Sequence, residues 1–255
     1  MPRPLGARSD QVSIVMTNLS VAQQALAEML LETNTQAKVV RRYSNGNGKF
    51  TFEEIIRETH PIDFTVHPGE FVLKIHDKKP DAPLSPFYIS LRNLPEELLT
   101  LVAKTIDEVT PKDGVDVCTG IPRAGIPLAL EYSKVSGIPF EDVLEKTGEP
   151  GTTRQIVGKI RVNGQGKRLI IVDDLVTHAG TKLEAIKAAE SLDYKVVGVA
   201  LLFDREQGGA EDLRKMGYPV YSALKLSDTL DYYLEKGKIS RERHQEIKDY
   251  LYNNI

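Results

Sequence analysis

The sequence has 255 residues, of which 41% are hydrophobic and 27% are charged, with a formal net charge of −3. These values are ordinary for a globular protein with its own core, and a slightly acidic chain lacks the positive field that favours nucleic-acid binding. No stretch approaches the roughly 18 apolar residues of a membrane-spanning helix, and the single cysteine, Cys118, excludes an internal disulfide. We expect a cytoplasmic protein that binds neither nucleic acid nor membrane, with Cys118 in its core.

The N-terminal region contains one predicted helix and one stretch without a clear pattern. Residues 1–17 are predicted to form a poorly ordered tail. Asn18 or Ser20 can cap a helix that carries apolar residues at helical spacing as far as Leu30. The polar stretch 33–68 has a turn at its Asn-Gly-Asn-Gly sequence but no clear period, so its structure and its role stay open.

Two strands and a helix are predicted next. Residues 71–75 and 87–91 have the apolar pattern of strands, and the three prolines between them indicate a loop. Pro95 is placed to begin a helix, because a first-turn residue needs no backbone N–H. The apolar side of that helix extends to Val109.

The remaining chain alternates between short apolar strands and helices. Strands are predicted at 115–119, 140–144, 169–172, 195–203 and 220–223, helices at 126–135, 181–191 and 211–216, and two more helices after Leu226, of which Ser240 caps the last. Strands rich in Val, Ile and Leu that alternate with helices indicate a parallel sheet covered on both faces. We therefore predict an α/β fold with a Rossmann-like sheet, divided into a tail, an N-terminal part (18–110), a core (111–225) and C-terminal helices (226–255).

One predicted strand of the core ends in two carboxylates. The run 169–172 is followed by Asp173 and Asp174, and then by a loop that leads into a helix. The carboxyl end of a parallel strand is where α/β folds bind ligands, and backbone N–H groups at a helix N-terminus bind phosphate. We expect the carboxylates to accept hydrogen bonds from the hydroxyls of a ribose, and its 5-phosphate to bind a loop made of Thr177, His178, Ala179, Gly180 and Thr181. An ordinary turn in which an Asp caps the helix is the alternative.

The ten residues from Val172 to Thr181 resemble the signature of the type I phosphoribosyltransferases. In that signature an apolar strand leads into two acidic residues, two apolar residues and a T-x-x-G-[ST] loop. The resemblance implies the fold of that family, with a small N-terminal hood over the core. It also implies binding of 5-phosphoribosyl 1-diphosphate (PRPP), with Mg²⁺ held mainly through PRPP itself.

A second loop, Thr119-Gly120-Ile121-Pro122-Arg123-Ala124-Gly125, lies between a predicted strand and a helix. Its glycines allow close approach of the backbone, and an Arg suits a diphosphate. From the residues of this loop alone, a tight turn with a solvated Arg is the favoured interpretation. In the family that the chain resembles, this loop binds pyrophosphate, which implies contacts of PRPP with Gly120, Pro122 and Arg123.

A finer resemblance concerns the base. Residues 71–74 and 85–92 resemble the F-x-L-K-S-G…S-P-x-Y-x-x-x-R segment of orotate phosphoribosyltransferases, and 204–209 their D-R-x-x-G-G stretch; the likeness covers about residues 68–235. It implies a base pocket lined by Lys74, Phe87, Tyr88, Thr177 and Arg205. Orotate is a flat anion, which needs an aromatic face and cations.

Each of these residues also has a simpler interpretation. Phe87 and Tyr88 point to opposite faces of a strand, so at least one of them is expected in the core. Lys74 has the character of a surface residue, and Arg205 can pair with Asp204 or Glu206.

The family also has a mobile loop, R-K-x-x-K-x-H-G, that closes over the site of a partner subunit, which implies a homodimer. Lys146 matches its first Lys and is a catalytic candidate beside Asp173 and Asp174. The pattern otherwise differs: Glu145 replaces the Arg, Glu149 or Pro150 stands at the second Lys, and no His is present. The substitutes that the chain offers are Arg154, Lys159 and Arg161.

The resemblance implies transfer of ribose 5-phosphate from PRPP to orotate, which gives orotidine 5-phosphate and pyrophosphate for pyrimidine biosynthesis. The altered loop leaves two alternatives. One is transfer to another base, such as a purine, and the other is a regulator that binds PRPP without turnover.

Overall fold

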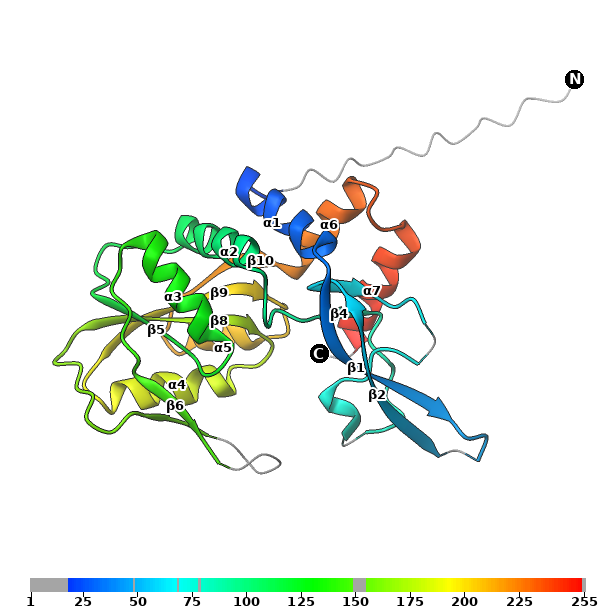
Figure 1. Cartoon of the computed structure of the whole chain (residues 1–255), viewed down its shortest axis with the longest axis horizontal. Helices are drawn as coiled ribbons and strands as arrows, with labels where there is room; N and C mark the ends of the chain where they lie inside the picture. Colours follow the sequence, from blue (N-terminus) through cyan, green and yellow to red (C-terminus); the bar gives the residue numbers. More distant parts are fainter. Residues whose placement is uncertain (1–17, 48, 68, 78, 149–154, 254–255) are drawn as a thin grey trace, which may run out of the picture.

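The computed structural model describes residues 18–47, 49–67, 69–77, 79–148 and 155–253, so the predicted tail lies outside the described residues. Figure 1 shows two lobes: the sheet and the helices that cover it lie on the left, and a smaller lobe with a long hairpin and the C-terminal helix lies on the right. No helix in these ranges combines the length and the apolar content needed to cross a bilayer.

The core is a four-stranded parallel sheet. Its strands are β5 (Val117–Gly120), β8 (Arg168–Val176), β9 (Lys195–Asp204) and β10 (Val220–Lys225), in the order β10-β9-β8-β5. The predicted parallel sheet is therefore confirmed. The predicted strand at 140–144 is wrong, because only Phe140 bridges to Cys118. The chain then turns away into β6 (Leu144–Thr147), which pairs antiparallel with β7 (Gln155–Gly158).

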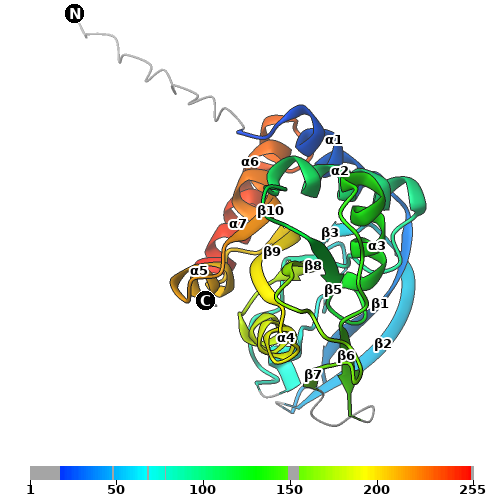
Figure 2. The ribbon, with the colours of Figure 1, turned by 90° about the vertical axis from the view of Figure 1, so that its left-hand side faces the viewer.

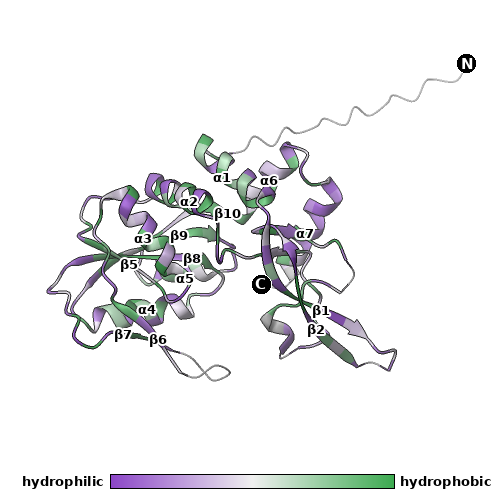
Figure 3. Ribbon diagram, in the orientation of Figure 1, coloured by the Kyte–Doolittle hydropathy of each residue, from purple (hydrophilic) through white to green (hydrophobic). Residues whose placement is uncertain are grey.

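Helices cover both faces of this sheet because its strands are apolar on both sides. Cys118, Ile170 and Val172 belong to the cluster beneath α2 (Glu96–Val109) and α3 (Gly125–Ser136). The alternate residues, including Leu169 and Ile171, face α4 (Gly180–Glu190) and α5 (Gly209–Lys215). Figure 2 shows α2 and α3 on the opposite side of the sheet from α4. In Figure 3 the ribbon of the C-terminal helix α7 (Arg241–Asn253), which lies outside these layers, is mostly purple. The Rossmann-like architecture follows from this two-sided burial.

The first described helix packs against the C-terminal part of the chain. Ser20 and Gln23 form a reciprocal capping box at the start of α1 (Val21–Glu32). The Tyr233 hydroxyl of α6 (Leu226–Glu235) donates to the Ala27 carbonyl at 2.6 Å. The last helix, α7 (Arg241–Asn253), begins where Ser240 Oγ accepts from the Arg243 N–H at 3.2 Å, as its predicted cap requires.

The stretch without a pattern forms a hairpin of β1 (Thr35–Ser44) and β2 (Phe50–Thr59). Next to it, β3 (Ile62–Phe64) pairs with β4 (Phe87–Ile89). Residues 71–73 are not the start of a strand, and η1 (Lys74–Asp77) is a 3₁₀ helix, so the strand predicted at 71–75 is wrong. The Phe71 and Val72 N–H groups donate in different directions, to the Ser85 and Val40 carbonyls, so no continuous ladder forms.

A buried ion cluster joins the hairpin to the rest of the smaller lobe. The Glu70 carboxylate is fully buried and accepts from Arg41 at 2.8 Å and from Arg57 Nη2 at 3.4 Å. Arg57 also pairs with Asp63 at 3.0 Å. Two cations and two anions thus neutralise each other, as buried charges must.

Candidate active site

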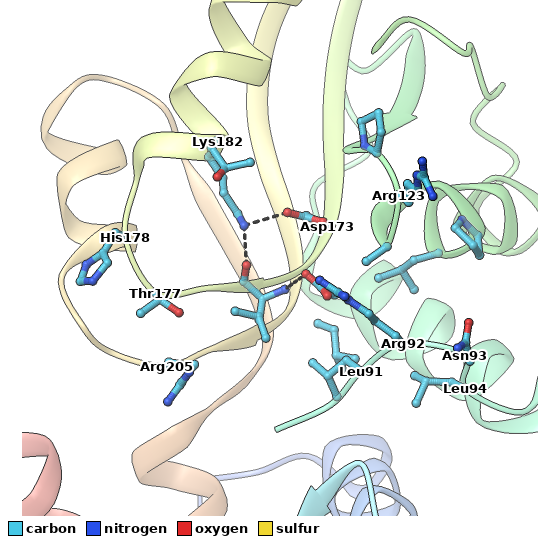
Figure 4. Close-up of a pocket in the computed structure, with 18 of the residues that line it drawn as sticks. Leu91, Arg92, Asn93, Leu94, Arg123, Asp173, Thr177, His178, Lys182 and Arg205 are labelled. Atoms are coloured by element: carbon cyan, nitrogen blue, oxygen red, sulfur yellow. Dashed lines mark hydrogen bonds and ion pairs between the residues drawn. The ribbon is translucent and has the colours of Figure 1, made fainter. Parts of the chain in front are cut away.

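A cavity of about 950 Å³ opens at the carboxyl end of β8, between the core and the smaller lobe. Figure 4 shows how its walls come from the sheet edge, the two predicted loops and the segment after β4. It brings together nine of the residues predicted for the site: Pro122, Arg123, Lys146, Asp173, Asp174, Thr177, His178, Thr181 and Arg205. Five others do not line it, namely Gly120, Phe87, Tyr88, Ala179 and Gly180, and the side chain of Lys74 lies outside the described part of the structure.

The two carboxylates at the end of β8 have different surroundings. Asp173 forms an ion pair with Lys182 of α4, with 2.7 Å between Oδ2 and Nζ. Asp174 Oδ1 accepts from the Leu175 N–H at 2.7 Å. Burial and the nearby charge of Asp173 raise the pKa of Asp174 to about 6, although Lys182 and Arg92 act in the opposite direction. Asp174 is therefore ionised at neutral pH and loses its charge in mild acid.

The loop from Thr177 to Thr181 leads directly into α4, as the predicted phosphate site requires. Gly209 packs directly against this loop. Its N–H donates to the Thr177 carbonyl at 3.2 Å, and a Cβ at this position would collide with the backbone of His178. A Cβ added at Gly180 would meet no atom within 4 Å. The loop therefore borders open space at the start of a helix, where the dipole favours an anion.

The loop from Thr119 to Gly125 lies next to β8 because β5 and β8 are neighbours. The Ile121 N–H donates to the Val172 carbonyl at 3.1 Å. A Cβ on Gly125 would lie 2.5 Å from the Val172 carbonyl oxygen, and one on Gly120 would lie 2.3 Å from the Gly125 carbonyl oxygen. Both glycines thus allow the turn to pack on β8. Gly120 is buried in the turn, whereas Pro122 and Arg123 reach the cavity.

Arg205 lines the side of the cavity nearest the smaller lobe. Its guanidinium carbon lies 5.3 Å from the centre of the Phe87 ring, and its Nε is buried without a hydrogen-bond partner among the described residues. Burial lowers the pKa of Arg205. The alternative of an ion pair with Asp204 or Glu206 is not seen: Asp204 accepts from the Glu206 N–H, and Glu206 accepts from Ser227.

The two predicted aromatic residues lie behind the cavity wall. Phe87 is 1% exposed and supports Arg205 from the core. Tyr88, on the opposite face of β4, stacks on Phe71 with 5.0 Å between ring centres. One of the two is a core residue, as their alternation on a strand predicted. Neither ring lines the cavity.

The cavity also contains polar residues to which sequence analysis gave no role: Arg92, Asn93, Lys182 and Gln207. The first two follow β4, and Asn93 has a left-handed backbone with φ of 56°, which Asn tolerates better than most residues. Gln207 has a buried Oε1 without a partner in the described part of the chain. Arg92 is the last residue of the S-P-x-Y-x-x-x-R pattern, and this position in the pattern could have pointed to a role for it. No pattern in the sequence pointed to Lys182.

The hairpin of β6 and β7 carries what is described of the predicted mobile loop. Lys146 reaches the cavity from β6. Of the possible substitutes for the missing cations, Lys159 is paired with Asp142, and neither Lys159 nor Arg161 lines the cavity. Glu149, Pro150 and Arg154 lie outside the described residues.

The charge of the cavity is opposite in sign to that of the chain. Its described lining has five Lys and Arg side chains but two carboxylates: Arg92, Arg123, Lys146, Lys182 and Arg205 against Asp173 and Asp174. The only ion pair between the two sets is that of Asp173 with Lys182. The remaining cations are available for an anionic ligand, which this local field attracts although the net charge of the chain is −3.

Comparisons with known proteins point to the same region. The model of a family described as "Phosphoribosyl transferase domain" matches residues 93–217. An orotate phosphoribosyltransferase from Sulfurisphaera tokodaii is 31% identical over 191 residues, which are 73% of this chain and 92% of that protein.

Two solved structures share the fold. The orotate phosphoribosyltransferase from Aeropyrum pernix has a TM-score of 0.52 and 26% identity, over 68% of this chain and 92% of that chain. The UMP synthase of Leishmania donovani has a TM-score of 0.63 and 25% identity over 91% of this chain, which spans 42% of that longer protein.

Proposed function

The chain belongs to the orotate phosphoribosyltransferase family, and we propose that it transfers ribose 5-phosphate from PRPP to orotate, with release of pyrophosphate. The observation that carries this proposal is the arrangement of charge in the cavity. Two carboxylates and an open helix N-terminus adjoin each other at the end of β8, and around them lie cations of which four have no ion pair with a described residue: Arg92, Arg123, Lys146 and Arg205. A phosphorylated pentose with a diphosphate needs this combination of acceptors and anion sites.

We infer the position of PRPP from the protein groups that suit each part of it. The 5-phosphate takes the open space at the start of α4, where it receives N–H groups of the loop 177–181. The ribose hydroxyls donate to Asp174. The diphosphate lies towards Arg123 and Arg92, on the side of the cavity where Figure 4 shows both guanidinium groups, and Lys146 approaches it from β6.

This placement also accounts for the reaction. The bond between C1 and the diphosphate oxygen breaks, and positive charge develops on the ribosyl ring. The carboxylates below the ring favour that charge, and Arg92, Arg123 and Lys146 stabilise the departing diphosphate. A ring nitrogen of the base then bonds to C1 from the opposite face, and its N–H proton passes to the departing diphosphate or to water. Preorganised charges of this kind reduce the barrier because they need no reorganisation during the reaction.

Mg²⁺ enters as part of the substrate. Among the described residues no group of three or more His, Cys, Asp or Glu side chains could hold a metal, and one of the two carboxylates of the cavity is already paired with Lys182. A cavity that is rich in cations instead fits an Mg²⁺ whose ligands are the oxygens of PRPP and water, as Mg²⁺ prefers at phosphates.

Orotate lies on the Arg205 side of the cavity. The buried and unpaired Nε of Arg205 is a donor for its carboxylate, and the unpaired Oε1 of Gln207 is an acceptor for a ring N–H. Thr177 lines the space between this side and the phosphate loop. Arg suits a planar carboxylate because two N–H groups can donate in parallel. A neutral or cationic base would leave this buried cation without compensation.

The test is a pyrophosphate-release assay with PRPP, Mg²⁺ and one base at a time: orotate, uracil, adenine, hypoxanthine or guanine. We expect release with orotate and formation of orotidine 5-phosphate, which chromatography identifies. Release with a purine alone would assign another transferase. Tight binding of PRPP by calorimetry without release for any base would assign a regulator. The implied homodimer is measured in parallel by light scattering.

A further inference from the structure

The C-terminal helix contributes one side chain to the cavity, that of Tyr250. Helix α7 lies beyond residues 93–217, which match the family model, so the family match gives this residue no role. Among the described residues that line the cavity, Tyr250 is the only Phe, Tyr or Trp. The cavity therefore receives its aromatic ring from a part of the chain that the motifs do not cover.

The packing of α7 directs Tyr250 towards the cavity. Residues three apart on a helix share a face, and Ile247, three positions before Tyr250, is completely buried. One turn earlier, Arg243 Nη2 donates to the Thr65 carbonyl at 3.0 Å, which ties the helix to the smaller lobe. Tyr250 itself is half-buried, whereas Tyr252 on the outer face is 86% exposed.

The ring of Tyr250 lies at the Arg205 end of the cavity. It meets the Phe87 ring at 89°, with 6.3 Å between the ring centres, and the Arg205 guanidinium lies over the same Phe87 ring. Burial raises the pKa of Tyr250, whereas a hydrogen bond with Ser85 and the charge of Arg205 act in the opposite direction. Tyr250 is thus an uncharged phenol at neutral pH, held beside the cation proposed for the orotate carboxylate.

This end of the cavity needs an aromatic surface for a flat base. Arg205 can pair with the carboxylate of orotate, but the two faces of the pyrimidine ring require apolar or aromatic contacts. Neither Phe87 nor Tyr88 lines the cavity, although both were predicted for this task. Tyr250 is the described side chain that combines an aromatic ring with a position next to Arg205.

We propose that Tyr250 is a specificity-determining residue of the base site, whose ring forms the aromatic wall against which the planar base lies while Arg205 binds its carboxylate. This inference rests on the proposed function, because the base is orotate. The C-terminal helix, which packs on the smaller lobe, thereby completes a site that the phosphoribosyltransferase core begins.

Kinetics of three variants separate the ring of Tyr250 from its hydroxyl. Tyr250→Leu removes the ring but keeps an apolar side chain, Tyr250→Phe removes the hydroxyl alone, and Tyr252→Leu is the exposed control in the same helix. In Tyr250→Leu we expect the KM for orotate to rise about 5- to 10-fold and the KM for PRPP to change little. The other two variants should have nearly unchanged values. A folded Tyr250→Leu protein with the wild-type KM for orotate, or a Tyr250→Phe protein as impaired as Tyr250→Leu, would overturn the proposal.

Fluorescence detects the base at this position without turnover. The chain contains no tryptophan, so Tyr250→Trp and its control Tyr252→Trp each carry a single reporter. We titrate both with orotidine 5-phosphate and expect quenching in Tyr250→Trp, because the base lies against the indole. The emission of Tyr252→Trp should change only through absorption of light by the ligand, which provides the correction.

Calorimetry of the wild-type protein with orotidine 5-phosphate separates the two ways in which the inference can fail. Binding to the wild-type protein and to Tyr250→Trp without quenching would remove Tyr250 from the base site and leave the proposed function intact. That conclusion would hold even if Tyr250→Leu had a raised KM for orotate, since a purely structural effect through Phe87 gives the same kinetics. An absence of binding to the wild-type protein would instead refute the proposed function, and this inference with it.

Discussion

The guanidinium group of Arg205 lies over the ring of Phe87, with 5.3 Å from its central carbon to the ring centre. The ring is buried, and it holds the cation at the edge of the cavity without pairing it. Truncation of Arg205 would therefore remove the donor for the orotate carboxylate without breaking an ion pair of the fold.

For Arg205→Ala we expect the KM for orotate to rise about 10- to 100-fold, because a hydrogen bond to a charged group contributes about 1.5–3 kcal/mol. The KM for PRPP should change little. Steady-state kinetics with each substrate varied in turn measure both values. Arg214→Ala, on the surface of α5, is the control. An orotate KM equal to that of the wild-type protein would place Arg205 outside the base site.

The raised pKa of Asp174 predicts how activity depends on pH. The ionised carboxylate accepts from the hydroxyls, and protonation below a pKa of about 6 removes that acceptor. We expect kcat/KM for PRPP to fall about tenfold per pH unit below this value. A profile of kcat/KM from pH 4.5 to pH 9 is sufficient. Full activity at pH 4.5 would contradict the role of Asp174.

Asp174→Asn tests the same group without a change of pH. Loss of a charge that stabilises the transition state should lower kcat about 100- to 1000-fold, while circular dichroism should show an intact fold. Asp113→Asn, an exposed aspartate in a turn, is the control. A kcat within the error of the wild-type value would remove Asp174 from the reaction.

The same variant should be more stable than the wild-type protein in alkali. The pKa of Asp174 is raised in the folded state, so the protonated form is favoured by folding, and its contribution to stability is present at low pH and lost as the pH rises through about 6. We expect the melting temperature of Asp174→Asn to exceed that of the wild type by about 2–4 °C at pH 8 and to match it near pH 4. A lower melting temperature at pH 8 would contradict this sign.

Two glycines separate ligand binding from packing. In Gly180→Ala the added methyl group meets no atom of the protein, and Ala favours a helix by about 1 kcal/mol. We expect unchanged or higher stability together with a raised KM for PRPP, because the methyl group enters the space of the 5-phosphate. In Gly125→Ala the methyl group would meet the Val172 carbonyl oxygen, so this variant, unlike Gly180→Ala, should be less stable than the wild-type protein. Unaltered PRPP kinetics in Gly180→Ala would place the phosphate elsewhere.

The core could be predicted from the sequence because its signals are local. The apolar run of β8 ends abruptly at Asp173, and the parallel order then brings the loop after β5 next to it. The hairpin was missed because its strands do not alternate cleanly: Ile56 and Phe52 are exposed, and their strand carries charges on both faces. The segment 71–75 has the composition of a strand, but its backbone hydrogen bonds go to two different neighbours.

The site was predictable where a motif is continuous and not where the fold assembles it. Asp174, Thr177 and Thr181 belong to one string of residues, and they line one cavity. Lys182 could not be identified from the sequence, because only the folded turn brings its side chain to the cavity and into an ion pair with Asp173.

The contact of α1 with α6 sets an order of events during synthesis. Ala27 accepts a hydrogen bond from a tyrosine that follows it by 206 residues, and Leu26 and Leu30 of α1 are buried in the finished protein. The two leucines have an earlier partner in α2, whose Leu98, Val102 and Ile106 belong to the same buried cluster. The hydrogen bond to Tyr233 can form only after every strand of the parallel sheet has been synthesised, so it is the step that fixes the N-terminal helix to the C-terminal part of the chain.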